Sequence, residues 1–524
     1  MSFQKIFIFF LILSVSTLCY SQFAGGSGTV DDPYQIATAE QLNQVRYYLT
    51  SSFIQTADID LGVAPWNEGA GWNPIGDYDP WNPTTSFRGN FNGQNFNISN
   101  MNIYRLDESD LGLFGSILGC KINNIRLMNF LIASERGYIG GISAMAYENE
   151  VSGCYSEGKI SGYSTIGLLF GFFEQNSITD CHVKGEIKGT GSSIGGLVGL
   201  CSITDVISDC TADVKLYTDR LSIGGIIGQA VAINMFSKNS SKCEITAAGE
   251  ASGCSGGLIG SLTSAQRNCI ISECYSTGYV DAQKDVATGG LIGELYISTD
   301  SVLIFNSYSN VNVQGNKAVG GFIGFIRKNT IIKNCYSTGK VTGNSDVGGF
   351  IGKIDTLNTV SAINSYWNTE TSGQLNSLLA EGRTTSEMSL PYSSNTYVDW
   401  DFETVWADDI FNLNAGYPML KWACGIEEDE DEFIAGDKGF ELYQNYPNPF
   451  NPVTKISYYL KKDDCIRLSV YNAEGQLIKL LVNGNIESGS HAVEFNAGDH
   501  NSGIYFYRLE IGNKVQSRKM LLLK

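Results

Sequence analysis

Histidine, proline and basic side chains are scarce in this sequence. The 524 residues include three histidines and ten prolines, and 54 acidic against 35 basic residues give a net charge of −19. There is no HExxH zinc motif, and three histidines leave little material for a hydrolytic triad. The acidic balance excludes a nucleic-acid partner, because phosphates require a basic surface. Beyond the first residues, no apolar run is long enough to span a membrane as a helix.

The first residues have the pattern of an export signal. Lys5 provides a basic start, and the apolar run over residues 6–15 is too short to cross a bilayer. Small residues follow, which predicts a signal peptide over residues 1–21. Cys19 raises the alternative of a lipoprotein signal, but Leu18 directly before it is the wrong residue for that cleavage.

A five-residue glycine phrase recurs through the middle of the chain, and its clearest copy is Gly195-Gly196-Leu197-Val198-Gly199. The last glycines of adjacent copies lie between 28 residues (Gly171 to Gly199) and 33 residues (Gly260 to Gly293) apart. A fixed period of this length indicates a repeat architecture. The other clear copies are 224–228, 256–260, 289–293, 320–324 and 348–352, and weaker copies stand at 167–171, 140–144 and 112–115.

Each glycine phrase is followed by a second phrase, best seen as Asn334-Cys335-Tyr336-Ser337-Thr338-Gly339, and by a third short run such as 340–343. These bursts of β-branched and aromatic residues with glycine-rich corners predict about three short strands in each repeat, and not helices. A β-propeller blade usually needs a longer repeat and ranks second. The pattern favours a right-handed parallel β-helix in which each repeat forms one coil.

Residues at equivalent repeat positions are expected to stack in columns. One column contains small side chains that fill the coil interior, with reduced, buried thiols and not disulfides. Its members are Cys154, Cys181, Cys210, Cys243, Cys274 and Cys335, with Ser307 and Ser365 as substitutes. The next residue in each strand then points outward. This predicts an exposed ladder, interrupted by Thr211 and Glu244, that is either lateral stacking or a candidate ligand-binding strip for sugars or peptides. The members of the strip are Tyr155, His182, Tyr275, Tyr308, Tyr336 and Tyr366.

These two phrases resemble the GLUG repeat of bacterial surface proteins, which include adhesins and some immunoglobulin A peptidases. The resemblance predicts a GLUG-repeat β-helix over residues 112–364, preceded at 22–111 by a cap and the first coils and followed at 365–423 by a closing coil and cap. Thr38-Ala39-Glu40-Gln41 has the form of a capping box, which predicts a short helix that covers the first coil.

The composition changes at the six consecutive acidic residues 427–432, which predict a solvated linker over 424–439. About seven short alternating strands follow over 440–524, which predict an immunoglobulin-like β-sandwich. The fold class is therefore expected to be all-β, a β-helix followed by a sandwich.

This last segment resembles the type A sorting domain of the bacterial type IX secretion system. The resemblance implies export across the outer membrane by the type IX machinery. It also implies later removal of the domain, with the mature protein released or joined to surface lipopolysaccharide. The motif residues that carry it are Tyr446, Pro447, Asn448, Pro449, Phe450, Gly475, Gly503 and Tyr505.

The sequence predicts no catalytic residues, no cofactor and no metal site. Asp58 and Asp60 form the closest acidic pair in a strand-like run, but they fit better as polar residues of an early coil. The pair Asp31 and Asp32 fits a turn better than a calcium site, because regular oxygen-ligand spacing is absent. We therefore expect a secreted or cell-surface, non-enzymatic, adhesin-like protein with a glycan or host-matrix ligand. The alternative is a secreted polysaccharide lyase or hydrolase on the same scaffold.

Overall fold

The structure is a computed structural model that describes residues 22–219, 222–249, 253–263, 269–296, 301–327, 329–355, 359–409, 412–424, 440–443, 445, 447–448, 450–472, 476–498, 500–511 and 514–522. The predicted signal peptide, and the predicted linker except Cys424, lie outside these residues. The chain divides into two compact units, residues 1–384 and 385–524. The domain boundaries given above stay predictions.

A short helix begins the first unit, as the capping-box pattern predicts. Helix α1 (Ala39–Gln44) follows Thr38, whose hydroxyl accepts a hydrogen bond from the backbone N–H of Gln41 at 3.3 Å. The Gln41 side chain reaches back to accept one from the backbone N–H of Ala37 at 2.8 Å, one residue before the N-cap, so the first half of the box is formed and the return bond is shifted by one residue. Leu42 of α1 is fully buried in the core of the solenoid, and the 3-10 helix η1 (Val45–Tyr47) follows directly.

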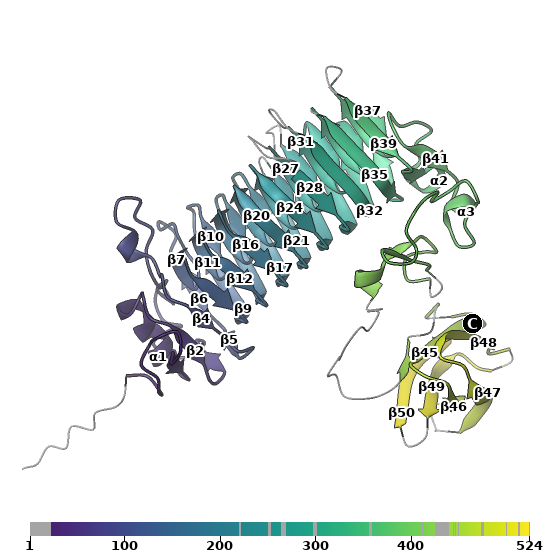
Figure 1. Cartoon of the computed structure of the whole chain (residues 1–524), viewed down its shortest axis with the longest axis horizontal. Helices are drawn as coiled ribbons and strands as arrows, with labels where there is room; N and C mark the ends of the chain where they lie inside the picture. Colours follow the sequence, from purple (N-terminus) through teal and green to yellow (C-terminus); the bar gives the residue numbers. More distant parts are fainter. Residues whose placement is uncertain are drawn as a thin grey trace, which may run out of the picture. The chain divides into compact units, whose positions relative to one another are not determined.

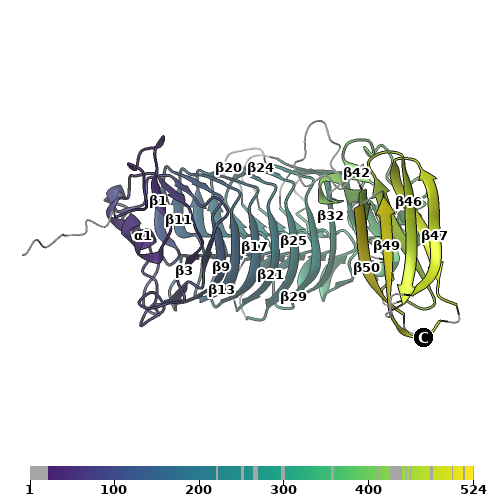
Figure 2. The ribbon, with the colours of Figure 1, turned by 90° about the horizontal axis from the view of Figure 1, so that it is seen from below.

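The first unit is a parallel β-solenoid (Figures 1 and 2). A typical coil has four strands and not the three that the repeat predicts, because the short strand before each Cys-Tyr-Ser phrase is separate. Two strands of each coil join one 24-stranded sheet, and the other two join a nine-stranded and an eight-stranded sheet. In this unit α2 (Thr369–Ser372) follows β40, and η2 (Pro83–Thr85) lies in a loop.

The strands of the 24-stranded sheet are β1 (Tyr34–Ile36), β2 (Phe53–Gln55), β3 (Ile59–Asp60), β4 (Phe91–Asn92), β5 (Asn97–Ser99), β6 (Asn102–Tyr104), β8 (Lys121–Asn123), β9 (Arg126–Ala133), β12 (Glu150–Ser152), β13 (Tyr155–Gly162), β16 (Ser177–Thr179), β17 (His182–Gly189), β20 (Thr204–Ser208), β21 (Thr211–Thr218), β24 (Ile233–Ser237), β25 (Ser240–Ala247), β28 (Cys269–Ser272), β29 (Tyr275–Ala282), β32 (Val302–Gly315), β35 (Thr330–Ser337), β36 (Val341–Thr342), β39 (Val360–Ile363), β40 (Tyr366–Asn368) and β41 (Glu381–Arg383). The nine-stranded sheet contains β7 (Phe114–Leu118), β11 (Ser143–Tyr147), β15 (Phe170–Glu174), β19 (Val198–Ser202), β23 (Ile227–Ala230), β27 (Ile259–Leu262), β31 (Ile292–Leu295), β34 (Ile323–Ile326) and β38 (Ile351–Ile354). The eight-stranded sheet contains β10 (Ile139–Gly140), β14 (Ile166–Gly167), β18 (Ile194–Gly195), β22 (Ile223–Gly224), β26 (Cys254–Gly256), β30 (Ala287–Gly289), β33 (Lys317–Gly320) and β37 (Ser345–Gly348).

The glycine phrase forms the sharp passage between the eight-stranded and nine-stranded sheets. A Cβ at Gly257 would lie 2.1 Å from the carbonyl oxygen of Gly290 in the next coil, and one at Gly225 would lie 2.1 Å from that of Gly257. Only glycine permits this approach of two backbones. The residue after the two glycines points into the core, where Phe322 and Phe350 stack with their centroids 4.6 Å apart. The phrase therefore encodes both the close turn and a stacked apolar interior.

The second unit begins with short elements, α3 (Thr385–Met388), an antiparallel pair of β42 (Trp406–Ala407) and β43 (Met419–Leu420), and η3 (Lys421–Cys424). Two antiparallel sheets follow, and both contribute to one hydrophobic core. The three-stranded sheet contains β44 (Phe440–Leu442), β45 (Val453–Leu460) and β48 (Gly489–Asn496). The four-stranded sheet contains β46 (Asp464–Asn472), β47 (Leu477–Ile486), β49 (Gly503–Ile511) and β50 (Lys514–Leu522). The chain is thus all-β with few helices, as predicted.

Candidate functional site

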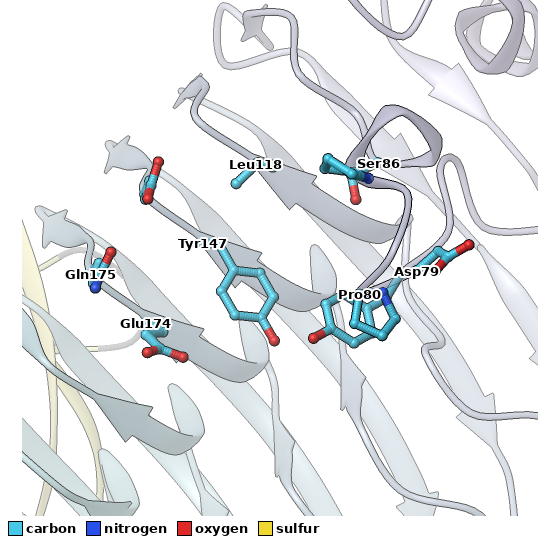
Figure 3. Close-up of a pocket in the computed structure, with 10 residues that line it drawn as sticks. Asp79, Pro80, Ser86, Leu118, Tyr147, Glu174 and Gln175 are labelled. Atoms are coloured by element: carbon cyan, nitrogen blue, oxygen red, sulfur yellow. The ribbon is translucent and has the colours of Figure 1, made fainter.

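A pocket of about 280 Å³ lies beside the loop 77–86 of the first unit. Tyr147, Glu174 and Gln175 come from neighbouring coils, and Asp79 and Pro80 come from the loop that faces them (Figure 3). The ring of Tyr147 stacks on that of Tyr78, with centroids 5.4 Å apart and 13° between the planes. The remaining lining residues are Pro83, Ser86, Leu118 and Glu148.

The pocket is acidic and partly desolvated. Its ten lining residues include the carboxylates of Asp79, Glu148 and Glu174 and no Lys, Arg or His. Burial raises the pKa of Glu174 above its ordinary value. Burial, followed by the neighbouring Tyr78 hydroxyl and Glu174, raises the pKa of Tyr147, so this phenol stays protonated at neutral pH. The pocket can therefore accept hydrogen bonds at its carboxylates and donate them from phenol and amide groups.

The loop 77–86, which forms one wall of the pocket, is held at its base by hydrogen bonds. The backbone N–H of Asp77 donates to the carbonyl of Thr85 at 2.9 Å, and the Ser86 hydroxyl donates to the carbonyl of Asp77 at 3.1 Å. At the tip, Asp79 accepts a hydrogen bond from the backbone N–H of Trp81 at 2.9 Å. The Trp81 side chain is 92 % exposed. This loop was not predicted, although the run DYDPWNPTTS, with Trp81 between two prolines outside the repeat, was the available signal.

The predicted tyrosine strip does form one column of the 24-stranded sheet. Tyr155, His182, Thr211, Ser240, Tyr275, Tyr308, Tyr336 and Tyr366 pair in sequence from coil to coil. Ser240, and not Glu244, is the second interruption, because Glu244 pairs with Lys215 and Tyr279 instead. The rings of Tyr275, Tyr308 and Tyr336 stack 4.9 Å apart with planes within 6°.

The predicted exposure of this strip is wrong for its later half. Tyr308, Tyr336 and Tyr366 are buried, with exposed fractions of 4 %, 0 % and 2 %. Neighbouring rings cover one another in the stack, and the guanidinium of Arg383 lies 5.4 Å from the ring centroid of Tyr366. The geometry of the later half is that of packed side chains, so a ligand can reach only the earlier half.

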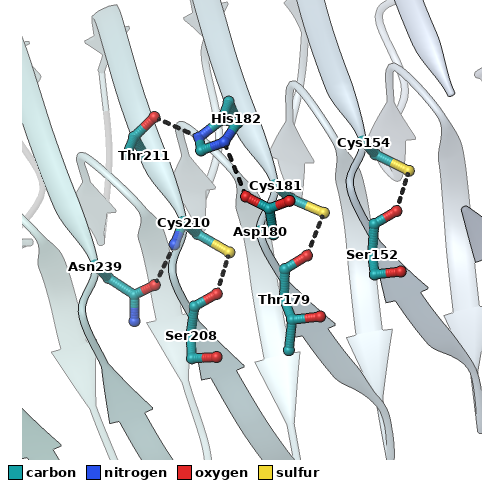
Figure 4. A network of polar contacts seen from close by, with 10 residues as sticks. All are labelled: Ser152, Cys154, Thr179, Asp180, Cys181, His182, Ser208, Cys210, Thr211 and Asn239. Atoms are coloured by element: carbon teal, nitrogen blue, oxygen red, sulfur yellow. Dashed lines mark hydrogen bonds and ion pairs between the residues drawn. The ribbon is translucent and has the colours of Figure 1, made fainter. Parts of the chain in front are cut away.

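The earlier half consists of Tyr155, His182 and Tyr275, which are partly exposed. The Tyr155 hydroxyl donates to Glu157 at 2.8 Å, and the guanidinium of Arg126 lies 4.9 Å from the Tyr155 ring centroid. His182 shares a hydrogen bond with the Thr211 hydroxyl at 2.8 Å (Figure 4). The Tyr155 hydroxyl is thus used within its own strand and the His182 ring between two coils, and ligand binding by the strip stays a prediction.

The cysteine column lies at a corner of each coil. The thiols of Cys154, Cys181 and Cys210 donate to the carbonyl two residues earlier at 3.5, 3.3 and 3.1 Å (Figure 4). The hydroxyls of Ser307 and Ser365 make the same bond at 3.0 Å. The position therefore requires a small hydrogen-bond donor, which explains why serine replaces cysteine there.

Cys243 is not a member of this column. Asn239 occupies the corner of that coil, where its side-chain oxygen accepts from the backbone N–H of Cys210 at 3.0 Å and its amide donates to Ile207 at 2.8 Å. Cys243 lies four residues later and pairs with Val214 and Gly278 inside the core. Residue type alone places Cys243 in the column, whereas the register of the strands matches Cys210 with Asn239.

The cysteines of the solenoid are buried thiols. All ten that the structure describes there are buried and free of disulfide bonds, as expected. Burial raises the pKa of Cys120, Cys201, Cys243 and Cys269 to about 12. Because the thiolate is the reactive form, the raised pKa disfavours nucleophilic chemistry at these four residues.

The carboxylates of the early acidic pair, Asp58 and Asp60, accept hydrogen bonds from backbone and amide groups. Asp58 accepts from the backbone N–H of Asn97 at 2.7 Å. Asp60 accepts from Asn100 and from the backbone N–H of Gly62, each at 2.8 Å, and these bonds lower its pKa, that from Asn100 most. Such a carboxylate is unsuited to act as a general acid. Among the described residues, no three His, Cys, Asp or Glu side chains gather as metal ligands do.

Asp31 and Asp32 lie at a turn. The carbonyl of Asp32 accepts from the backbone N–H groups of Ser27 and Gly28 at 3.0 and 2.9 Å, and its own N–H donates to the Thr29 hydroxyl at 3.1 Å.

The predicted sorting motif lies against the last strand of the second unit. Asn448 accepts from the backbone N–H of Leu521 at 2.8 Å, and the N–H of Phe450 donates to the carbonyl of Leu521 at 2.9 Å. Pro447 is exposed, and its carbonyl accepts from the Thr454 hydroxyl at 2.9 Å. Gly503 begins β49, in which Tyr505 is buried. Tyr446, Pro449 and Gly475 lie outside the described residues.

Comparison with protein families identifies two segments of the chain. Residues 444–523 match the secretion system C-terminal sorting domain, and residues 315–342 match the GLUG motif. Both predicted resemblances are thereby confirmed. The sorting domain indicates export by the type IX secretion system, interaction with its machinery, and a secreted or cell-surface location. No helix among the described residues is long and apolar enough to cross a membrane.

Three curated proteins resemble parts of the chain. The "Putative Gly-rich membrane protein" of Evansella cellulosilytica is 41 % identical over 115 residues, 21 % of this chain. Halomucin of Haloquadratum walsbyi is 28 % identical over 186 residues, 33 % of this chain. The immunoglobulin A1 protease of Streptococcus pneumoniae is 27 % identical over 235 residues, 43 % of this chain. The chain spans only 13 %, 2 % and 10 % of these proteins. No solved structure significantly matches it.

Proposed function

We propose that the chain is a non-enzymatic, adhesin-like protein of the cell surface. One observation supports the proposal: a sorting domain follows a solenoid whose columns of polar side chains contact other groups of the solenoid itself. The thiols bond to corner carbonyls, the tyrosines stack on one another, and the early carboxylates accept backbone hydrogen bonds. Exported solenoids with such internally satisfied side chains present a long surface for contact with a partner.

The proposal also includes the handedness of the coils, the type of β-sandwich and the fate of the sorting domain after export. We infer right-handed coils, because parallel crossover connections strongly prefer that hand. The two antiparallel sheets with a common core support an immunoglobulin-like sandwich. After export, the sorting domain is removed and the rest is released or joined to surface lipopolysaccharide.

The export part is tested by deletion and transfer of residues 440–524. The truncated chain should stop in the periplasm, whereas an unrelated exported protein fused to this segment should reach the surface of a host with the type IX machinery. Protease accessibility on intact cells measures both results. A truncated chain that still reaches the surface would contradict the role of the segment.

A polysaccharide lyase or hydrolase is the second candidate, and the loop pocket favours it most. Its three carboxylates include Glu174, whose pKa is raised by burial, and a general acid needs such a shift. The pocket lacks the Lys or Arg that a lyase site combines with its acids. Incubating the exported protein with a panel of polysaccharides and measuring new reducing ends and unsaturated products separates the two functions. Product formation that is lost in E174Q would establish the enzyme and overturn the adhesin.

A further inference from the structure

The loop 77–86 presents aromatic surface to solvent from a fixed base. Trp81 is 92 % exposed and Tyr78 is 37 % exposed, whereas Ser86 at the base is buried and its hydroxyl lies 2.9 Å from that of Ser116 in β7. An indole left in water next to a pocket carries a free-energy cost that the fold itself does not recover. Burial of Trp81 by a ligand would recover it.

The polar groups beside these rings favour a ligand rich in hydroxyl groups. The half-buried carboxylate of Glu174 has no ion pair among the described residues, and the lining offers no cation to anchor an anionic ligand. Gln175 adds an amide that both donates and accepts. Sugar hydroxyls can satisfy these groups, and a carboxylate bond is stronger than a neutral one.

The arrangement of the rings distinguishes a sugar from an organic cation. A cation site surrounds the charge with aromatic faces. Here Tyr78 and Tyr147 lie nearly parallel on one another, and Tyr147 also contacts the ring of Phe172 at 5.4 Å, so the faces are already paired. The free aromatic face of the loop is that of Trp81, which directly follows the pocket-lining Pro80 and suits the apolar face of a pyranose ring.

We propose that the pocket beside the loop 77–86 binds an uncharged saccharide, with a pyranose ring against Trp81 and hydroxyl groups bonded to Glu174 and Gln175. The pocket of about 280 Å³ accommodates one or two sugar rings. This inference rests on the proposed adhesin function and gives it a ligand class and a place in the early coils, away from the tyrosine strip.

The test measures binding of the exported full chain to an array of neutral, acidic and amine-bearing glycans, followed by titration calorimetry with the best neutral oligosaccharide. W81A and E174Q should each weaken that affinity at least tenfold, about 1.4 kcal/mol. Y104A is the matched control, because Tyr104 is 57 % exposed on β6 and lines no part of the pocket, and it should bind like the wild type. Thermal melting of all three variants checks that they fold.

The outcomes separate this proposal from the function on which it rests. Neutral-glycan binding that W81A and E174Q leave unchanged would overturn the pocket as the site, while the adhesin function would stand. A preference for amine-bearing glycans would overturn the choice of an uncharged ligand. Cells that display the chain and adhere to neither glycan surfaces nor matrix proteins would remove the adhesin function itself.

Discussion

In both halves of the 24-stranded sheet, equivalent side chains of adjacent coils lie one strand spacing apart, but the two halves use different residues there. In the early coils an outward column, here called the charge ladder, runs Glu157, Lys184, Asp213, Lys242, with Lys184 3.7 Å from Glu157 and Lys242 3.6 Å from Asp213. From Tyr275 onward a second column, here called the tyrosine ladder, places the rings of Tyr275, Tyr308 and Tyr336 4.9 Å apart. Parallel in-register strands set equivalent residues side by side, so charges must alternate in sign whereas aromatic rings can repeat.

The two ladders also differ in what they contribute. The ion pairs of the charge ladder are exposed, since the side chains of Lys184 and Lys242 are 55 % and 74 % exposed. Each such pair contributes less than about 1 kcal/mol to the free energy of unfolding. The tyrosine ladder is largely buried, so its rings contribute several times more through removal of apolar surface from water. Stability should therefore be concentrated in the later coils, and solubility in the earlier ones.

The largest effect is expected at a close backbone contact between two coils at the start of the tyrosine ladder. Gly257 lies between β26 and β27, in the coil whose strand β29 begins with Tyr275. In G257V a side chain would meet the carbonyl oxygen of Gly290 at 2.1 Å, so the coils must separate, at a cost above about 4 kcal/mol. Thermal and urea unfolding measure the loss. G119A is the control, because a Cβ at Gly119 meets nothing within 4 Å and its left-handed φ of 64° costs only about 1 kcal/mol. Equal stability of G257V and wild type would show that the phrase is not a steric requirement.

Removing one ring from each half of the aromatic column tests the difference in burial directly. Y336A should lower the free energy of unfolding by about 3–5 kcal/mol, because Tyr336 is fully buried in the stack. Y155A should cost about 1 kcal/mol, because Tyr155 is partly exposed and loses one guanidinium contact and one hydrogen bond to Glu157. Both values come from urea unfolding of the same preparation. Similar losses in the two variants would contradict the division of stability between the halves.

Carboxylates in the two halves should respond to pH in opposite ways. Hydrogen bonding to Lys188 lowers the pKa of Glu186 in the early coils, whereas burial raises the pKa of Asp285, near the later coils, to about 7. The folded chain therefore holds a proton on Asp285 that the unfolded chain releases near pH 4, so stability should fall as the pH rises from about 4 to about 7. In D285N this part of the pH dependence should disappear, and the protein should melt higher at pH 8. D281N, a change at a partly exposed position near the end of β29, is the control, and an unchanged pH profile in D285N would refute the assignment.

The sequence predicts the periodic features of this fold better than it predicts the register of the strands or the burial of individual side chains. The glycine phrase and the Cys-Tyr-Ser phrase recur, so the stacked coils and buried thiols could be predicted. The position of Cys243 could not, because only strand pairing shows that Asn239 fills its expected corner. Burial of Tyr336 depends on what stacks above and below it, which the local pattern does not state. The loop that presents Trp81 lies outside the repeat, so a search for periodicity passes over it.

The smallest expected effect tests why signs alternate in the charge ladder. K184E places three acidic side chains in adjacent coils, since Lys184 pairs in register with Glu157 and Asp213. Repulsion at one strand spacing should cost about 0.5–1 kcal/mol at low ionic strength, and most of this cost should vanish in 0.5 M salt, where the Debye length is a few Å. K340E makes the same charge change at an exposed lysine with no ion pair among the described residues, and it should cost less than about 0.3 kcal/mol. Unfolding of both variants at the two salt concentrations gives the comparison. A loss in K184E that persists in high salt would mean that packing of the aliphatic stem, and not alternation of charge, holds Lys184 in the ladder.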